Sequence, residues 1–287
     1  MADRSSDVST TDTLRLGLIG DHIGRSRFSA AMDLLCREHG LVLDFTPIDT
    51  GEMPDFDFDT KVDELIAAEW TGVTITHPYK IAARERAGAG MIPEAAHLTA
   101  SNLLTFRPEI KGFNTDYTGF VGAWGAVMGD AAPGRVAIAG AGGVAGAIVP
   151  ALVALGASDI AVWDPAPGAA KRLAELVGGP VRAVPTSESH AESEVADGLV
   201  NASALGMGDD RRSAFSTSAI EAQTWAFDAV YTPTRTTFLK TAASQGLTTI
   251  SGFDLFRHMI LGSFEAYTGI RPDADLMLPL IDALRPD

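Results

Sequence analysis

Hydrophobic residues follow two alternating patterns along most of the chain. Short continuous apolar runs, typical of buried strands, alternate with stretches in which apolar residues recur at helical spacing. Such alternation predicts an α/β fold in which helices cover parallel sheets. Before residue 115 we predict strands at Leu14–Gly20, Leu43–Ile48, Gly72–Thr76 and Asn102–Phe106, and helices at Ser26–His39, Lys61–Glu69 and Pro78–Arg86. Later strands are predicted near Val136–Ala139, Ile160–Trp163, Val181–Val184, Leu199–Asn201, Ala226–Val230 and Thr248–Ile250, and the last helices at Leu255–Tyr267 and Asp275–Leu284.

The longest apolar run, from Val136 to Ala157, breaks at a cluster of glycines and continues as an Ala- and Leu-rich helix. A strand, a glycine turn and a helix in this order are typical of a pyrophosphate-binding loop. Gly140 would permit the tight turn, Gly142 would let the backbone approach the phosphates, and the helix would direct its free N–H groups at the anion. The predicted phosphate loop comprises Gly140, Ala141, Gly142, Gly143 and Val144.

The same run is long enough to span a bilayer, since about 20 apolar residues suffice. Glycines and Pro150 interrupt it, no cluster of lysines or arginines flanks it, and a second apolar strand follows at the spacing of a βαβ unit. We therefore expect no contact with a membrane. A Rossmann-like unit without a ligand stays open as an alternative, because a fold does not by itself imply a function.

The next predicted strand, Ile160–Trp163, ends in Asp164. An acidic residue at this place accepts hydrogen bonds from a ribose 2′-hydroxyl and repels a 2′-phosphate. The sequence therefore favours NAD as the cofactor over NADP.

The glycine turn lies well inside the chain, so another α/β unit with its own core precedes the nucleotide-binding unit. We predict a substrate-binding and catalytic domain over residues 1–116 and a Rossmann-type, doubly wound dinucleotide-binding domain over residues 117–251. C-terminal helices over residues 252–287 are expected to pack back on the first domain. The substrate would lie in the cleft between the two domains.

Composition narrows the classes of partner and compartment. The formal net charge of −15 argues against a general nucleic-acid surface. The single cysteine, Cys36, excludes internal disulfides and a thiolate metal cluster, so no metal is predicted, and its apolar neighbours indicate a buried thiol. The polar leader MADRSSDVSTTDT lacks the apolar segment of a secretory signal and is interpreted as a frayed end, which predicts a cytoplasmic protein. A homodimer is left open.

Two polar segments at predicted strand ends could carry proton transfer. An alcohol that gives a hydride to a nicotinamide needs a group to take up its hydroxyl proton. Lys80 follows the strand at residues 72–76, and Asp116 lies near a predicted helix N-terminus, where a carboxylate is stabilised as the anion. Together they could move a proton to and from an alcohol. Taken singly, each is also typical of a surface charge or a helix cap, and His77 is interpreted as structural.

Six segments in order resemble motifs of the shikimate/quinate dehydrogenase family and span nearly the whole chain. Residues 72–80 (GVTITHPYK) resemble the family's GxNVTxPxK, which carries a catalytic lysine, and residues 112–120 (GFNTDYTGF) resemble GxNTDxxG, which carries its partner aspartate. Residues 140–147 (GAGGVAGA) look like the phosphate loop GAGGAxxA, and residues 201–207 (NASALGM) resemble NxTxxGM beside the cofactor. Residues 226–246 are similar to DxxYxPxxTxLLxxAxxxG, and residues 252–269, with GFDLF and SFEAYTG, look like the C-terminal helix.

The resemblance implies an NAD(P)-dependent oxidoreductase that acts on a ring hydroxyl of shikimate, quinate or a close analogue, a small carboxylated cyclic polyol. Shikimate chemistry belongs to aromatic amino acid biosynthesis. Lys80 would be the acid/base group and Asp116 its hydrogen-bonded partner. The implied substrate-binding residues are Ser26, Thr76, Asn102 and Tyr231. Further residues implied beside the cofactor are Ala204, Met207 and Gly252.

Several positions depart from the family's pattern. A serine, an asparagine, a threonine and a glutamine of the family are replaced here by Phe28, Thr74, Leu103 and Met259. Each change removes a hydrogen-bonding group from the expected pocket and loosens the demand for a polar substrate group. Arg25 or Arg27 could supply a compensating cation for a carboxylate.

The cofactor segment departs as well. NADP-using members carry Asn-Arg-Thr where this chain has Asp164-Pro165-Ala166, which agrees with the charge argument for NAD. The departures leave two alternatives open. One is a dehydrogenase for a variant substrate such as an aminated shikimate analogue. The other is a non-catalytic binding protein that senses a dinucleotide.

Overall fold

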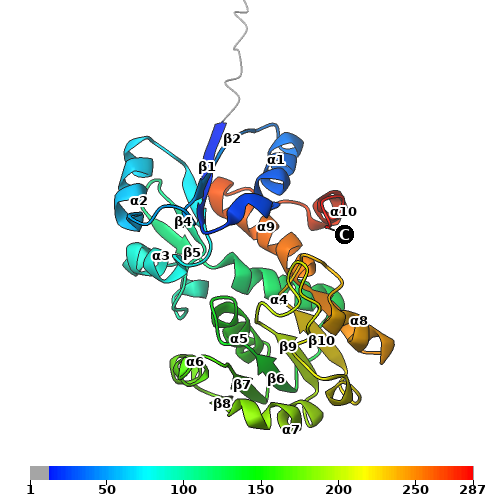
Figure 1. The fold of residues 1–287 in the computed structure, drawn as a ribbon. Helices are drawn as coiled ribbons and strands as arrows, with labels where there is room; N and C mark the ends of the chain where they lie inside the picture. The colour runs from blue at the N-terminus through cyan, green and yellow to red at the C-terminus, as the bar shows by residue number, and fades with distance from the viewer. Residues whose placement is uncertain (1–12, 287) are drawn as a thin grey trace, which may run out of the picture.

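Two sheets, each flanked by helices, make up the structure, a computed structural model that describes residues 13–286 (Figure 1). The first sheet has the strand order β2-β1-β3-β4-β5, and the second has the order β11-β10-β9-β6-β7-β8. This arrangement confirms the predicted two-part α/β fold. The polar leader, interpreted from the sequence as a frayed end, lies outside the described residues up to residue 12.

The first sheet is mixed. Its strands are β1 (Thr13–Gly20), β2 (Val42–Asp49), β3 (Gly72–Ile75), β4 (Leu103–Thr105) and β5 (Lys111–Phe113). The first three run parallel, whereas β4 and β5 are each antiparallel to the preceding strand. The sequence analysis does not predict β5, because three residues that alternate with a glycine give no apolar periodicity.

Helices cover both faces of this sheet. Helix α1 (Phe28–Glu38) packs on one face, where Leu35 and the fully buried Cys36 share a core with Phe264 from the C-terminal part of the chain. Burial raises the pKa of the Cys36 thiol to about 11, and nearby Asp33 adds to this, as expected for a structural thiol. Helices α2 (Phe58–Ala67) and α3 (Lys80–Ala87) build a second core on the other face.

The start of α3 differs from the prediction. We predict a helix that begins at Pro78, but the chain first makes a turn, in which the Tyr79 N–H donates to the Thr76 carbonyl at 3.0 Å. The helix therefore begins at Lys80, which becomes its first residue. Single 3-10 turns lie at Ile23–Arg25 (η1), Gly88–Gly90 (η2), Pro93–Ala95 (η3), Thr186–Glu188 (η4) and Thr217–Ala219 (η5).

The second sheet is parallel throughout. Its strands are β6 (Arg135–Ala139), β7 (Asp159–Trp163), β8 (Val181–Ala183), β9 (Gly198–Asn201), β10 (Trp225–Asp228) and β11 (Thr248–Ser251). Its helices are α5 (Ala145–Ala154), α6 (Ala169–Val177), α7 (Ser189–Glu194) and α8 (Thr237–Ser244). The apolar run of residues 136–157 thus splits into β6 and α5. Within residues 13–286, no helix has both the length and the apolar character for crossing a membrane.

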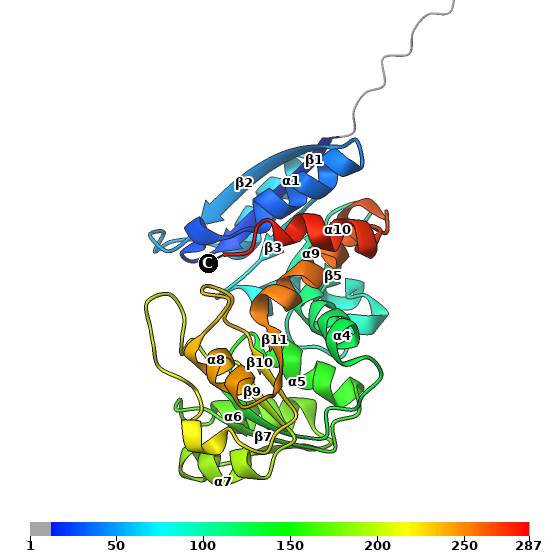
Figure 2. The same cartoon turned by 90° about the vertical axis from the view of Figure 1, so that its right-hand side faces the viewer.

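Helices α4 (Thr115–Met128) and α9 (Gly252–Thr268) connect the two sheets and pack along each other. Glycine permits this close approach, because a Cβ at Gly119 would lie only 2.9 Å from Met259 Cβ. Helix α9 returns the chain to the first sheet, and α10 (Ala274–Asp282) then lies beside α1, as expected for the C-terminal helices (Figure 2). The domain boundaries at residues 116 and 251 stay a prediction; the first falls inside α4 and the second at the junction of β11 and α9.

Candidate active site

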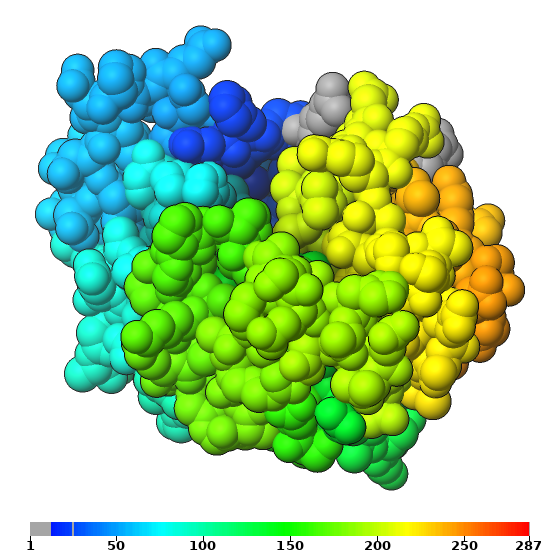
Figure 3. Space-filling view, turned by 60° about the horizontal axis from the view of Figure 1, so that its bottom comes forward, coloured from blue at the N-terminus to red at the C-terminus, as the bar shows by residue number. Residues whose placement is uncertain are grey.

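A cleft of about 710 Å³ lies between the two sheets. The strand ends that border it are the carboxyl ends of β1 and β3 on one side and of β9 and β10 on the other, where ligands bind in open α/β sheets. In the space-filling view the surface is hollowed where the blue N-terminal part faces the green and yellow parts of the second sheet (Figure 3).

Lys80 and Asp116 meet in this cleft. Lys80 Nζ lies 2.7 Å from Asp116 Oδ2, and the two side chains are 18% and 14% exposed. Asp116 occupies the first turn of α4, where the helix dipole favours a carboxylate, and Asn114 caps this helix by accepting the Tyr117 N–H at 3.1 Å. The pair is therefore a partly buried, hydrogen-bonded ammonium and carboxylate with access to the cleft.

Asn102 stands directly before β4 and is hydrogen-bonded to the first residue of α4. Its Oδ1 accepts the Thr115 N–H at 2.7 Å, and its Nδ2 donates to Thr115 Oγ1 at 3.0 Å. Thr115 Oγ1 also lies 3.1 Å from Ser263 Oγ on α9. Asn102 thus lines the cleft and, through Thr115, positions the helix turn that carries Asp116. No sequence pattern predicts these roles of Thr115 and Ser263, although Thr115 stands within the GFNTD motif.

The other predicted substrate residues also line the cleft: Ser26, Thr76 and Tyr231. Ser26 Oγ accepts the N–H of Phe28 at 3.2 Å. The Tyr231 ring stacks on Phe256, with centroids 5.6 Å apart and an interplanar angle of 14°. Burial raises the pKa of Tyr231, although the guanidinium and backbone N–H of Arg27 act in the opposite direction. The structure therefore gathers the four predicted substrate residues around the Lys80–Asp116 pair.

The predicted phosphate loop is a glycine turn between β6 and α5. Gly140 has a φ of 102°, and a Cβ there would lie 2.8 Å from the backbone of Ala202 and Ser203, so only glycine fits. A Cβ at Gly142 or Gly143 would meet nothing within 4 Å, so this backbone is open to a ligand. No side chain caps the N-terminus of α5 at its N-cap residue.

Asp164 lies against this loop. Its Oδ2 accepts the Ala141 N–H at 2.8 Å, and its Oδ1 accepts the Ala166 N–H at 2.7 Å. Each carboxylate oxygen keeps a further acceptor site, so the residues present fit the adenosine ribose and the pyrophosphate of a dinucleotide. The predicted cofactor residues fall into three places. The phosphate-loop region contains Gly140, Ala141, Gly142, Gly143 and Asp164, and the cleft is lined by Val144, Ala204 and Met207. Gly252 is buried, and a Cβ there would lie 2.8 Å from the Ala229 carbonyl carbon.

Comparison with known sequences identifies the protein family of this chain. A scan against protein-family models found no match. The quinate/shikimate dehydrogenase (NAD(+)) of Corynebacterium efficiens is 32% identical over 277 residues, which cover 93% of this chain and 96% of the relative. The chain belongs to the shikimate/quinate dehydrogenase family. It is accordingly an NAD(P)-dependent oxidoreductase of this family, as the motifs indicate.

Solved structures of the family agree. A quinate dehydrogenase from Corynebacterium glutamicum, in complex with NAD, matches with a TM-score of 0.88 and 29% identity over 95% of this chain and 100% of that chain. A shikimate 5-dehydrogenase from Thermus thermophilus, in complex with NADP(H) and shikimate, matches with a TM-score of 0.81 and 30% identity over 94% and 99% of the two chains. The two structures therefore contain different nicotinamide cofactors.

The positions that depart from the family's pattern are spread over the cleft. Thr74 and Met259 line it, as does the aromatic side chain of Phe28, which is otherwise buried against the core. Leu103 is fully buried and does not line the cleft. Of the two arginines expected to supply a cation, Arg27 is exposed and the side chain of Arg25 lies outside the described part of the structure.

Asp228, at the end of β10, is a buried carboxylate that the sequence analysis misses. Its Oδ1 accepts from Asn201 Nδ2 at 2.9 Å and from the Val230 N–H at 3.0 Å, and its Oδ2 accepts from Thr236 Oγ1 at 2.6 Å. Burial raises the pKa of Asp228 to about 6, against the effect of these donors. The carboxyl therefore holds the two ends of the loop that carries Tyr231.

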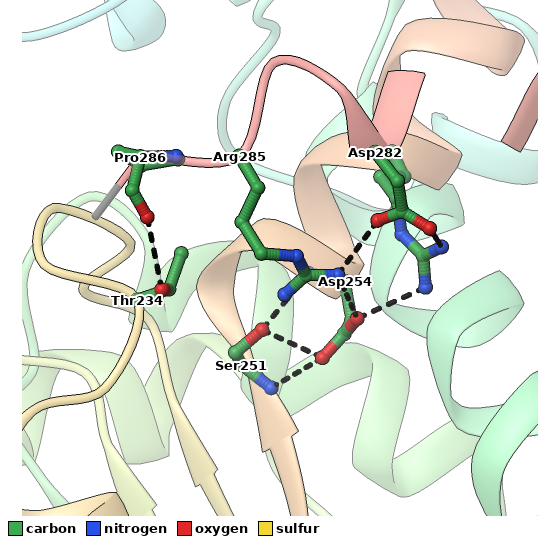
Figure 4. Close-up of polar contacts among 7 residues, drawn as sticks. Thr234, Ser251, Asp254, Asp282, Arg285 and Pro286 are labelled. Carbon is green, nitrogen blue, oxygen red and sulfur yellow. Dashed lines mark hydrogen bonds and ion pairs between the residues drawn. The ribbon is translucent and has the colours of Figure 1, made fainter. Parts of the chain in front are cut away.

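The C-terminal segment also contacts the loop that carries Tyr231, between β10 and α8 (Figure 4). We call residues 282–286 the C-terminal strap. Thr234 Oγ1 donates to the Pro286 carbonyl at 3.1 Å, and Arg285 pairs with Asp282 at 2.7 Å and Asp254 at 3.6 Å. Burial would raise the pKa of Asp254, but its hydrogen bonds with Ser251 and the nearby arginines hold it below the ordinary value. The strap thus ties the cleft loop to the first turn of α9.

Proposed function

We propose that this protein transfers a hydride between NAD and a ring hydroxyl of shikimate, quinate or a close analogue. Oxidation would convert shikimate and NAD to 3-dehydroshikimate, NADH and a proton. The observation that carries the proposal is the Lys80–Asp116 pair, 2.7 Å apart in a cleft that also contains Val144, Ala204 and Met207 from the phosphate-loop side. The family and the NAD in the similar quinate dehydrogenase of C. glutamicum support it.

The bound nicotinamide would supply the hydride chemistry, and the side chains of this chain would manage the proton. In reduction, the Lys80 ammonium gives a proton to the carbonyl oxygen; in oxidation, the proton of the reacting hydroxyl returns to Lys80 Nζ. Asp116 orients Nζ and stabilises the ammonium that forms. Ser26, Thr76, Asn102 and Tyr231 would hold the ring from the sides of the cleft.

NAD is proposed over NADP because of Asp164. Its carboxylate lies beside the phosphate loop, bonded to the Ala141 N–H, where the adenosine ribose of a dinucleotide is expected. A 2′-phosphate brought there would meet a negative charge without the arginine that NADP-using members carry in this segment.

The test is a screen for reduced-nicotinamide absorbance with shikimate, quinate and their amino relatives, each with NAD and with NADP. Turnover of a hydroxylated ring acid with NAD supports the proposal. Firm NAD binding without turnover of any compound overturns it in favour of a dinucleotide-sensing protein. Turnover of an amino relative alone assigns the variant substrate.

A further inference from the structure

Thr74 lies in the floor of the cleft, on β3, and is only 5% exposed. Its hydroxyl lies 2.7 Å from the hydroxyl of Tyr267, near the end of α9 and 193 residues away in the chain. The Tyr267 ring fits beside β3 because Gly72 has no side chain; a Cβ there would lie 2.7 Å from Tyr267 Cε1. The packing of α9 against the first sheet therefore builds this pair.

The two hydroxyls carry two protons, but only one of these can lie in the bond between them. Within the described residues, Thr74 is the one hydrogen-bond partner of the Tyr267 hydroxyl. If Thr74 donated, the proton of Tyr267 would be buried without an acceptor, which is costly. The Tyr267 hydroxyl must therefore donate to Thr74 Oγ1, and the proton of Thr74 is left for the cleft.

The state of Tyr267 agrees with this direction. Burial raises the pKa of Tyr267, and the hydrogen bond with Thr74 opposes that effect only in part. The phenol therefore keeps its proton around neutral pH, where it can act as a donor.

We infer that Tyr267 is a positioning residue for the substrate, which acts by holding Thr74 as a hydrogen-bond donor to the substrate. This inference rests on the proposed function and adds the chemical nature of one substrate group. The group that faces Thr74 must be a hydrogen-bond acceptor, such as a hydroxyl or carboxylate oxygen. An ammonium group at the same point offers donors alone and would leave the Thr74 proton without an acceptor.

The test compares wild type, Tyr267→Phe, Thr74→Val and the double variant in steady-state oxidation of the preferred ring acid. Tyr267→Phe should raise the substrate KM about two- to tenfold, the range of one neutral hydrogen bond, and leave kcat and the KM of NAD within about twofold. Thr74→Val should raise the substrate KM at least as much. Adding Tyr267→Phe to Thr74→Val should cause no further rise in KM, because Tyr267 acts through Thr74.

Thermal unfolding supplies a second readout. Thr74→Val leaves the Tyr267 hydroxyl buried without a partner, so Tm should fall, and adding Tyr267→Phe should restore part of the loss. Thr105→Val is the matched control, a buried threonine on β4 that does not line the cleft. It should leave the substrate KM unchanged.

The outcomes separate this inference from the proposed function. If wild type turns over no ring acid, the proposed function fails. If wild type is active and Tyr267→Phe leaves the substrate KM unchanged, or raises it equally in the Thr74→Val background, the positioning role is wrong. A loss of Tm without a change in KM would identify Tyr267 as a packing residue alone.

Discussion

Lys80 Nζ and Asp116 Oδ2 lie 2.7 Å apart, although the first residue begins α3 and the second lies in the first turn of α4. The bond joins two helix starts at one side of the cleft. A backbone bond reinforces it, because Ser101 N–H donates to the Lys80 carbonyl at 2.9 Å. Surface ion pairs are solvent-exposed and most contribute little to stability, whereas these two side chains are mostly buried. The geometry therefore favours a catalytic pair over a surface charge.

Replacement of Lys80 by alanine should lower kcat for the preferred ring acid about 100- to 10,000-fold, the usual contribution of a positioned acid or base. The KM of NAD should change less than about threefold, because Lys80 lies on the first-sheet side of the cleft. Steady-state kinetics in both directions measures the effect. Lys61→Ala, which removes a surface lysine paired with Glu64, is the control and should stay near wild type. A Lys80→Ala variant within tenfold of wild-type kcat would remove Lys80 from the mechanism.

Asp164→Asn should shift cofactor preference. The amide oxygen can keep the bond from the Ala141 N–H while the bond from the Ala166 N–H is lost, and the side chain no longer repels a 2′-phosphate. Removal of one charge a few ångström from a dianion is worth about 1–2 kcal/mol at the surface, which predicts about a tenfold rise in the ratio of kcat/KM for NADP to that for NAD. The control is Asp130→Asn, an exposed carboxylate at the opposite end of the second sheet. A wild type that prefers NADP would contradict the argument at the outset.

Arg285→Ala tests the C-terminal strap. The variant loses the ion pairs with Asp282 and Asp254 and a contact of the guanidinium with the Phe253 ring at 4.6 Å. Because Arg285 is 39% exposed, we expect a cost of only about 1 kcal/mol, or a fall in Tm of about 2–4 °C. The released strap should also loosen the loop that carries Tyr231, so the substrate KM should rise more than kcat falls.

Arg37→Ala provides the matched control for the strap. Arg37 pairs with Asp33 on the surface of α1, and its side chain is 71% exposed. Its loss should leave both Tm and the substrate KM near wild type. An equal response of the two variants would show that the strap does not act on the cleft.

The second sheet could be predicted from sequence more completely than the first. Its four central strands are largely apolar and buried, as in Ile160–Trp163, and glycines mark its phosphate loop. In the first sheet, Lys111–Phe113 is too short to produce a pattern, and the antiparallel direction of β4 depends on its pairing with β3. The local spacing of apolar residues does not show which strands pair or in which direction they run.

The residues of the candidate site also differ in how far the sequence predicts them. Lys80 and Asp116 stand in contiguous motifs, so the sequence predicts both. The contacts of Thr115 with Ser263 and of Thr74 with Tyr267 join residues 148 and 193 positions apart. They exist because α9 returns to the first sheet, and the path of that return is set by packing with α4.

Asp228 should make stability fall as the pH rises from about 4 to 7. Burial raises its pKa from an ordinary value of 3.8 to about 6 in the folded protein. Between these values the folded protein binds the proton more tightly than the unfolded chain does. Its contribution is therefore complete below the unfolded pKa and is lost as the pH rises through the folded one.

The neutral variant Asp228→Asn removes this dependence. Relative to wild type, its free energy of unfolding should improve by about 2 kcal/mol between pH 4 and pH 7, as follows from a shift of about two pKa units. Urea unfolding of both proteins at several pH values gives the difference directly and cancels the other carboxylates, many of which act with the opposite sign. A constant difference between Asp228→Asn and wild type would mean that the carboxyl of Asp228 titrates alike in the folded and unfolded states.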